Sequence, residues 1–404
     1  MTPSQWFEQL LDIMLAKQAS DLLISTGAPP CLKLDGKLVA LGDVPLQPDQ
    51  VRELVAIALP QGRREAFETE HEANFALSLS GKGRFRVSAF FQRSQPAMVV
   101  RRIAFDIPDL ESLGLPEVTG TLASIRRGLV LVVGGTGSGK STTLASMIQH
   151  RNRTVGGHII CIEDPIEYMH PHQRGIINQR EVGIDTESYE VALKNALRQA
   201  PDVIVIGEIR SRDTMELALS FAETGHLCLA TFHANNADQT IERILSLFPP
   251  SRQEQIGMDL SLNLRAVVAQ RLLPRQDGSG RCLATEVLLK SPLISELIRR
   301  GEVGELKDLM RRSRELGMQT FDQALYNLYV QGEITYEDAL LHADSANDLR
   351  LMIKLGSETD GQHLMQDQLS HGLSLEEEEE VASRTRRFRR ICTRSRSAPS
   401  SRAR

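Results

Sequence analysis

The order of hydrophobic and polar residues divides this chain into segments with different periodicities. In residues 3–19, Phe7, Leu10, Leu11 and Met14 recur at the spacing of one helical face. That spacing predicts an amphipathic helix near the start of the chain.

Short segments of alternating apolar residues follow this helix. Asp35 and Gly36 separate two of these segments, and an Asp-Gly pair favours the tight type I′ turn of a hairpin. The pattern predicts a small α+β domain at residues 1–103, built on an antiparallel sheet. Its predicted elements are strands at 21–25, 31–34, 37–40, 75–79, 85–89 and 97–103, and a helix at 47–69.

A different pattern begins after residue 116. Residues 104–116 contain Pro108 and Pro116 and have little periodicity, so we predict a linker there. The chain then alternates apolar strands with helical segments, which is typical of an α/β domain with a parallel sheet, here predicted over 117–355. Its predicted strands are 129–133, 158–162, 203–206 and 227–231, and helices are predicted beyond residue 255 at 257–273, 292–314, 320–331 and 336–352.

Composition and charge narrow the class of protein. The 404-residue chain has a formal net charge of −5, whereas nucleic-acid binders usually carry a basic surplus. No segment reaches about 18 continuous apolar residues, and Gln5, Glu8 and Asp12 interrupt the apolar N-terminus, so we expect neither a membrane span nor a signal peptide. The five cysteines are widely spaced without a C-x-x-C pair, which favours reduced cytoplasmic thiols over disulfides or a zinc site.

The C-terminal segment, residues 356–404, has segregated charges. Residues 376–380 are all glutamate, and residues 384–404 are rich in arginine and serine. Such a composition predicts a disordered tail. The alternative is that the arginines contact anionic lipid or another anionic polymer.

Residues 134–141 carry the most specific chemistry, because they form a complete G-x-x-x-x-G-K-[ST] phosphate loop between an apolar strand and a helix-compatible segment. Glycines let backbone N–H groups surround a phosphate, and the start of the helix adds a positive dipole. Lys140 can reach the β- and γ-phosphates of a nucleotide, and the Ser141 hydroxyl can hold Mg²⁺. The predicted nucleotide-binding residues are Gly134, Gly135, Thr136, Gly137, Ser138, Gly139, Lys140, Ser141 and Thr142.

Polar side chains also follow the other three predicted strands of the parallel sheet. Since ligands bind outside the carboxyl ends of such strands, we expect these side chains to meet at one site beside the loop. They are Glu163 and Asp164 after the second strand, Glu208 and Arg210 after the third, and His233 after the fourth.

Glu208 is the predicted water-activating carboxylate, because it follows an apolar strand at the position of a Walker B motif. Gly207 stands where that motif usually has a metal-associated aspartate. Metal contacts are therefore expected from Ser141, with Asp164 and Glu163 as the natural carboxylate suppliers.

Three of these residues have a structural alternative. Glu163, also a candidate catalytic residue, and Asp164 would instead cap the turn that follows their strand. His233 is predicted to sense or hold the γ-phosphate, and its alternative is a purely structural histidine at a strand end.

The motifs together resemble those of the secretion-type ATPases. The phosphate loop is accompanied by an Asp box at 162–167, a Walker B segment at 207–210 and a His box at 224–233. Residues 19–22 and 83–87 look like the type IV pilus retraction ATPases, the PilT/PilU family. The resemblance covers residues 3–355 and implies a PAS-like N-terminal domain, a RecA-like ATPase domain with a helical C-terminal part, and a hexameric ring that uses ATP and Mg²⁺.

The C-terminal region departs from the PilT branch of that family, which usually carries an AIRNLIRE-like helix. Residues 292–300 read PLISELIRR instead, and together with residues 317–322 and 344–349 they resemble the PilU branch. A second departure is Leu23, where many relatives have histidine, and it lies outside the predicted nucleotide site.

The resemblance adds further candidate nucleotide-binding residues, since arginines of the N-terminal domain approach the nucleotide in that family. The alternative for an arginine on an alternating strand is a position on the solvated face. The added candidates are Arg84, Arg86, Arg101, Arg210 and Arg243, with His226 of the His box.

The function implied by this resemblance is a cytoplasmic ATPase, peripheral to the inner membrane at the pilus base, that powers or assists pilus retraction and twitching motility. Its expected partners are further copies of itself in a hexamer, a paralogous retraction ATPase and an inner-membrane pilus platform protein, without nucleic acid. One alternative is an accessory ring subunit that depends on the paralogous motor. Another is a pilus-assembly or type II secretion ATPase, which commonly carries a tetracysteine insertion that this sequence lacks.

Overall fold

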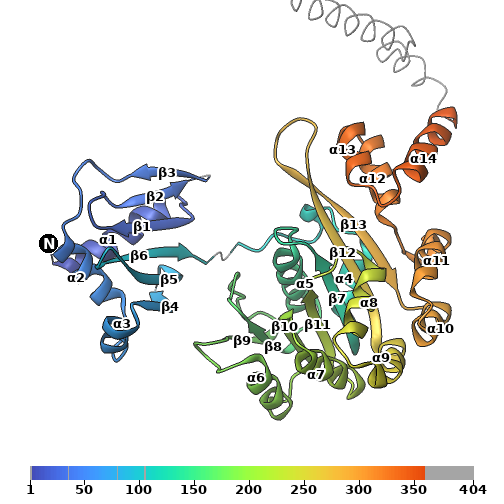
Figure 1. Cartoon of the computed structure of the whole chain (residues 1–404), viewed down its shortest axis with the longest axis horizontal. Helices are drawn as coiled ribbons and strands as arrows, with labels where there is room; N and C mark the ends of the chain where they lie inside the picture. The colour runs from blue at the N-terminus through green and yellow to red at the C-terminus, as the bar shows by residue number, and fades with distance from the viewer. Residues whose placement is uncertain (1, 35, 80, 104–105, 360–404) are drawn as a thin grey trace, which may run out of the picture.

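Two β-sheets organise the chain (Figure 1). The computed structural model describes residues 2–34, 36–79, 81–103 and 106–359. The first sheet has six antiparallel strands in the order β3-β2-β1-β6-β5-β4. Its elements are α1 (Pro3–Ala16), β1 (Asp21–Ser25), β2 (Cys31–Leu34), β3 (Lys37–Ala40), α2 (Pro48–Ala58), α3 (Arg64–Glu70), β4 (Glu72–Leu79), β5 (Gly83–Gln92) and β6 (Gln95–Arg102).

The helix α1 begins at a capping box, in which Thr2 and Gln5 satisfy each other's backbone N–H groups. Its predicted apolar stripe is buried in the core of the six-stranded sheet, together with Phe85 of β5. The helix predicted over 47–69 is wrong as a single element. It is divided into α2 and α3 by a break containing Pro60, which lacks a backbone donor, and Gly62, whose φ is +95°.

The second sheet has seven strands in the order β13-β12-β7-β11-β10-β8-β9, of which β13 alone is antiparallel to its neighbour. The predicted α/β class with a parallel sheet is therefore confirmed. The strands are β7 (Gly128–Gly134), β8 (Gly157–Glu163), β9 (Gly175–Glu181), β10 (Val203–Ile209), β11 (Leu227–Phe232), β12 (Leu264–Pro274) and β13 (Arg281–Leu289). The helices around them are α4 (Val118–Ser124), α5 (Lys140–Thr154), α6 (Tyr189–Ala196), α7 (Arg212–Glu223), α8 (Ala237–Ser246) and α9 (Pro250–Asn263).

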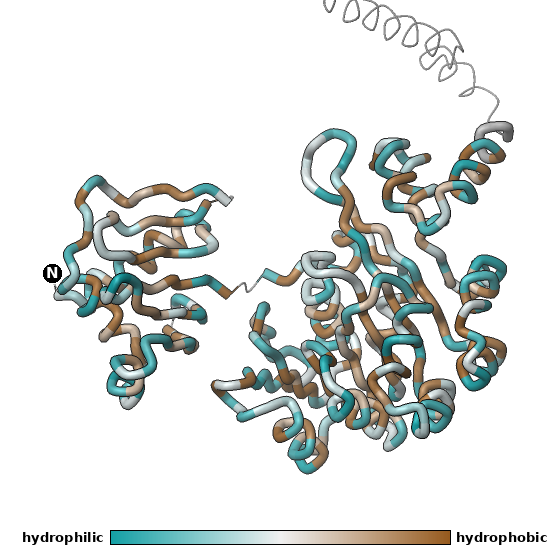
Figure 2. The backbone as a smooth tube through the Cα atoms, viewed as in Figure 1, coloured by the Kyte–Doolittle hydropathy of each residue, from teal (hydrophilic) through white to brown (hydrophobic). Residues whose placement is uncertain are grey.

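Both faces of this sheet are covered, so its central strands are apolar along most of their length (Figure 2). Alternate residues of β7 belong to two separate cores. Leu131 packs in the core with α6–α9, while Val130 and Val132 pack in the core with α4 and α5. Polar side chains are therefore confined mainly to the ends of these strands.

The sequence did not predict three strands of this sheet, β9, β12 and β13. The helix predicted at 257–273 is wrong beyond Asn263, where α9 ends and β12 begins. A strand that is apolar on both faces cannot be separated from a buried helix by periodicity alone. The strands β9 and β13 were not predicted.

Helices complete the chain as far as it is described. The segment 292–314, predicted as helical throughout, is divided into α10 (Pro292–Arg300) and α11 (Leu306–Arg312) at Gly301, whose φ is +73°. The remaining helices are α12 (Phe321–Val330), α13 (Tyr336–Leu341) and α14 (Ala346–Thr359). The helix α14 continues past the predicted boundary at residue 355, and the rest of the predicted tail lies outside the described residues. No helix in the described part of the chain is long and apolar enough to cross a membrane.

The six-stranded sheet can be tested separately, because Trp6 is the only tryptophan of the chain and packs against that core. We expect Phe85→Ala to cost about 3–5 kcal/mol of unfolding free energy, since it removes a fully buried ring. Denaturant titration followed by Trp6 fluorescence measures this loss. Leu38→Ala, at a β3 position that is 62% exposed, is the control and should stay within about 0.5 kcal/mol of the parent. Equal losses would contradict the burial of Phe85.

Candidate functional site

The phosphate loop connects β7 to α5 at the carboxyl edge of the seven-stranded sheet. Lys140 is the first residue of α5, and its ammonium group donates to the carbonyls of Gly134 and Gly135 at 2.9 and 2.8 Å. Gly134 has no room for a side chain, because an added Cβ would lie 2.4 Å from Ser138 Oγ and 2.7 Å from the Gln270 carbonyl. Gly139 precedes the helix with φ +90°, a value that favours glycine. The glycines thus let the loop close around its own lysine.

The loop fits the phosphates of a nucleotide. Ser138 Oγ is buried without a hydrogen-bond partner among the described residues, and the N-terminus of α5 opens beside it. Burial lowers the pKa of the Lys140 ammonium, while the charge of Glu208 acts in the opposite direction. A group with several anionic oxygens would supply acceptors to all of these donors.

A pocket of about 440 Å³ joins the loop to the other strand ends. The loop after β7 and the carboxyl ends of β8, β10 and β11 all contribute to it. Tyr168, His170 and the apolar Leu144, Ala145 and Ile148 line it as well, and the sequence analysis did not identify them. The predicted site residues in its lining are Thr136, Gly137, Lys140, Ser141, Glu163, Asp164, Glu208, Arg210 and His233.

Glu208 is held by a partner on each carboxylate oxygen. His233 Nε2 lies 2.8 Å from Oε1, and Arg210 Nη2 lies 2.7 Å from Oε2. The glutamate side chain is 16% exposed, whereas those of His233 and Arg210 are 41% and 64% exposed. This arrangement places a fixed carboxylate at the pocket wall, where it can accept a hydrogen bond from water or respond to a change at either partner.

The absence of a side chain at Gly207 has a steric reason. An added Cβ would lie 3.1 Å from both Glu163 Cα and the Tyr189 hydroxyl. A longer side chain there would have to displace the backbone of β8. Metal ligands in this pocket therefore have to come from other residues, and the lining includes Ser141 and Asp164.

Glu163 lies at the end of β8 and is held from the neighbouring strand β9. Burial raises its pKa to about 7, and the hydrogen bond from Gln179 Nε2, at 3.0 Å, acts against that rise. Gln179 also donates to the carbonyl of Tyr168 at 2.7 Å and accepts from the N–H of His170 at 2.9 Å. It therefore fixes both the glutamate and the loop after it. Sequence reasoning missed Gln179 because it missed β9.

Several predicted residues do not belong to the described pocket lining. His226 precedes β11 at the opposite end from His233, and its Nδ1 lies 3.1 Å from Thr224 Oγ1. Arg243 is exposed on α8. Thr142 faces the loop after β8 instead, with its Oγ1 3.0 Å from the Tyr168 hydroxyl.

The predicted arginines of the six-stranded sheet are engaged elsewhere. Arg101 pairs with Asp21 at 2.7 Å, and Arg84 reaches Glu181 at the end of β9 at 3.2 Å. Burial raises the pKa of Glu181, and the positive charges of Arg84 and Arg86 act against that rise. Arg84 and Arg86 thus act next to the strand that carries Gln179, and neither lines the described pocket.

Comparison with known proteins agrees with this geometry. The family model described as "Type II/IV secretion system protein" matches residues 68–339. A Pseudomonas aeruginosa relative named "Type IV pilus ATPase PilU" is 62% identical over 370 residues, covering 92% of this chain and 96% of the relative. The "Type IV pilus retractation ATPase PilT" of the same organism is 40% identical over 331 residues, or 82% of this chain and 96% of the relative.

One solved structure matches the fold of this chain over nearly the whole length of the solved chain. The crystal structure of the pilus retraction motor PilT with bound ADP has a TM-score of 0.79 and 42% identity, and the match covers 84% of this chain and 98% of that one. The predicted resemblance to pilus retraction ATPases and the predicted fold class are both confirmed. The phosphate loop, the strand-end pocket and the matched length lead to one assignment. The chain belongs to the type II/IV secretion system protein family.

Proposed function

We propose that this chain is an ATP hydrolase that powers or assists type IV pilus retraction and twitching motility. The observation that carries the proposal is the single pocket in which Lys140, Glu208 and His233 meet. The similarity of the chain to the pilus ATPases PilU and PilT supports the role in pilus retraction. Hydrolysis would supply the energy for relative motion of the two sheets and hence of a ring.

Each group in the pocket has a role in this proposal. Lys140 and the loop N–H groups would bind the β- and γ-phosphates, while Ser141 and Asp164 would hold Mg²⁺. Glu208 orients the attacking water, and His233 reports the state of the γ-phosphate through its 2.8 Å contact with Glu208. Mg²⁺ held there would supply positive charge that stabilises the transferring phosphoryl group.

The remaining assignments depend on assembly. Arg86, Arg101 and His226, which do not line the pocket of a single copy, reach nucleotide when copies of the chain associate, whereas Arg210 already lines the pocket. The assembly is a homo-hexamer in the cytoplasm that works with a paralogous retraction ATPase and an inner-membrane pilus platform protein. Its units are a PAS-like domain at 1–103, a linker at 104–116, the ATPase domain at 117–355 and a tail at 356–404.

A second candidate is an accessory ring subunit that depends on a paralogous motor. It is favoured by the higher identity to PilU, 62%, than to PilT, 40%. It is also favoured by α10, whose sequence departs from that of the PilT branch and whose Glu296 is engaged by Arg299 and Arg300 of the same helix.

The binding role of the phosphate loop is tested by Lys140→Ala. We expect ATP turnover to fall by about 10²–10³-fold, because the buried cation that faces the phosphates is lost. A coupled phosphate-release assay measures turnover. Lys194→Ala, at an exposed lysine of α6, should leave it unchanged. Unchanged turnover in Lys140→Ala would refute the site.

The catalytic role of Glu208 is tested by Glu208→Gln, which keeps the size of the side chain but not its basicity. We expect ATP binding to survive while single-turnover hydrolysis slows by about 10²–10⁴-fold. Fluorescent-nucleotide binding and rapid-quench measurements separate the two effects. Glu187→Gln, at an exposed position after β9, is the matched control. Equal slowing in both variants would rule out a specific role for Glu208.

Cell experiments distinguish the hypothesis of an independent motor from that of an accessory subunit. If the chain is a motor, cells that carry it as the sole retraction ATPase should retract pili, and Lys140→Ala should abolish retraction. If it is accessory, retraction should return only when the paralogue is added. Single-pilus force measurements or twitching-zone assays give the readout.

A further inference from the structure

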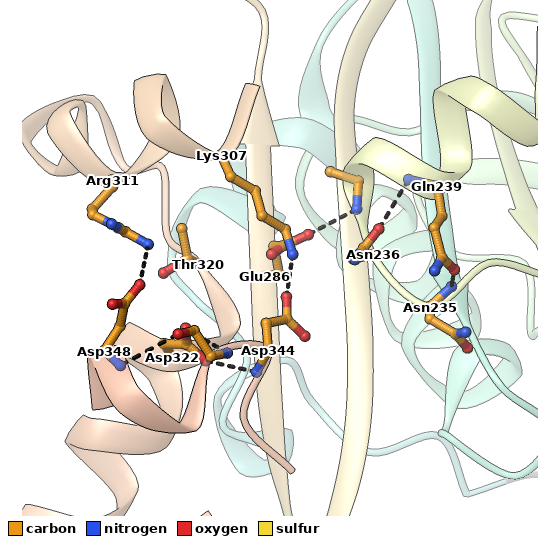
Figure 3. A network of polar contacts seen from close by, with 12 residues as sticks. Asn235, Asn236, Gln239, Glu286, Lys307, Arg311, Thr320, Asp322, Asp344 and Asp348 are labelled. Carbon is orange, nitrogen blue, oxygen red and sulfur yellow. Dashed lines mark hydrogen bonds and ion pairs between the residues drawn. The ribbon is translucent and has the colours of Figure 1, made fainter. Parts of the chain in front are cut away.

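A cluster of charged side chains fastens the C-terminal helices to the seven-stranded sheet (Figure 3). Its centre is Asp344, in the loop between α13 and α14, whose side chain is 17% exposed. Two cations form ion pairs with this carboxylate. Arg271 of β12 places its Nη2 2.6 Å from Oδ1, and Lys307 of α11 pairs with Oδ2. We call Arg271, Glu286, Lys307 and Asp344 the coupling cluster.

The loop that carries Asp344 is fixed from several sides. Asp322 of α12 accepts hydrogen bonds from the N–H groups of Asp344, at 2.8 Å, and Ser345, at 3.2 Å. Arg271 donates to the carbonyl of His342 at 2.6 Å, and its guanidinium lies 3.9 Å from the centre of the Phe321 ring. The arrangement of α12–α14 therefore depends on where β12 and α11 place their cations.

The first connection to the nucleotide edge runs through β12. Gln270 precedes Arg271, so the two side chains point to opposite faces of the sheet. Gln270 Nε2 donates to Thr143 Oγ1 at 2.8 Å on α5, and its residue pairs with Gly134 of the phosphate loop. Any shift of the loop or of α5 would thus move Gln270, the residue next to Arg271 on β12.

The second connection runs through β13. Glu286 is fully buried, and its Oε1 accepts a hydrogen bond at 2.7 Å from the N–H of Ala237, the first residue of α8. Only a short loop separates Ala237 from His233 in the nucleotide pocket. The other oxygen of Glu286 has no hydrogen-bond partner among the described residues, and Figure 3 places the Lys307 ammonium next to that carboxylate.

We infer that the coupling cluster makes the position of α12–α14 depend on the nucleotide in the pocket, so that these helices are the part of the chain that reports ATP binding and hydrolysis. The inference rests on the proposed nucleotide site. Gln270 connects that site to its neighbour Arg271, and Glu286 connects it to the nearby Lys307. These two cations hold Asp344. A buried carboxylate is costly to leave without its cation, so the cluster changes partners as a unit rather than gradually. The segments 317–322 and 344–349, which resemble the PilU branch, supply Asp322 and Asp344.

Hydrogen–deuterium exchange of the full-length protein tests this inference. Peptides from α12–α14 are compared with ADP bound and with a non-hydrolysable ATP analogue bound. We expect the parent protein to exchange differently in the two states, and Asp344→Asn to reduce that difference at least about threefold. Lys307→Met and Glu286→Gln should act in the same way, since each removes one charge from the cluster. Nucleotide affinity, measured on the same samples, should stay within about threefold of the parent value.

Asp348→Asn is the matched control. The Arg311–Asp348 pair, at 3.1 Å, also joins α11 to α14, but both side chains are 48% exposed and neither contacts β12 or Glu286. This variant should keep the full nucleotide-dependent difference.

Several results would overturn the inference: no difference in the parent, a difference that survives in Asp344→Asn, equal losses in Asp344→Asn and Asp348→Asn, or loss of nucleotide binding in the cluster variants. A parent protein that binds neither nucleotide would overturn the proposed function as well, whereas binding without a difference at α12–α14 overturns this inference alone.

Discussion

The burial of both faces of the seven-stranded sheet is the constraint on which the site depends. Because β7, β8, β10 and β11 have apolar neighbours above and below, charged groups are excluded from most of their length. Lys140, Glu163 and Glu208 can therefore appear only where the strands end, and the parallel arrangement brings those ends to one edge. The requirement for a dry core thus also concentrates charge in one pocket.

Hydrogen bonds then set the position of each charge within that pocket. Glu208 has one partner on its own strand end, Arg210, and one from the next strand, His233. Glu163 is held by Gln179 of β9, which also fixes the loop after β8. Since each carboxylate is tied to a neighbouring strand, a small movement between strands changes the geometry of the site. Such sensitivity suits a protein whose chemistry has to be converted into motion.

Much of this could be predicted from the sequence. The strands β7, β8, β10 and β11 are short and mostly apolar between helical segments, and the phosphate loop marks which end of the sheet is used. The strands β9, β12 and β13 could not be separated from other structures by period alone. The roles of Gln179, Gln270 and Glu286 were therefore not predicted either. A polar residue inside a buried strand is explained only by its hydrogen-bond partner in another element. His226 became a candidate through the resemblance, and it precedes β11, at the opposite end of that strand from His233.

The pocket lining carries more carboxylates than lysine and arginine side chains. Four carboxylates line the pocket, against the cations of Lys140 and Arg210: Glu163, Asp164, Glu167 and Glu208. Burial raises the pKa of Glu163 to about 7, so a proton can relieve part of this excess before any ligand enters. A triphosphate would add several negative charges in a partly buried site, where they are weakly screened. With Gly207 leaving no carboxylate at the usual Walker B position, the residues suited to a compensating divalent cation are those that already border the phosphate loop.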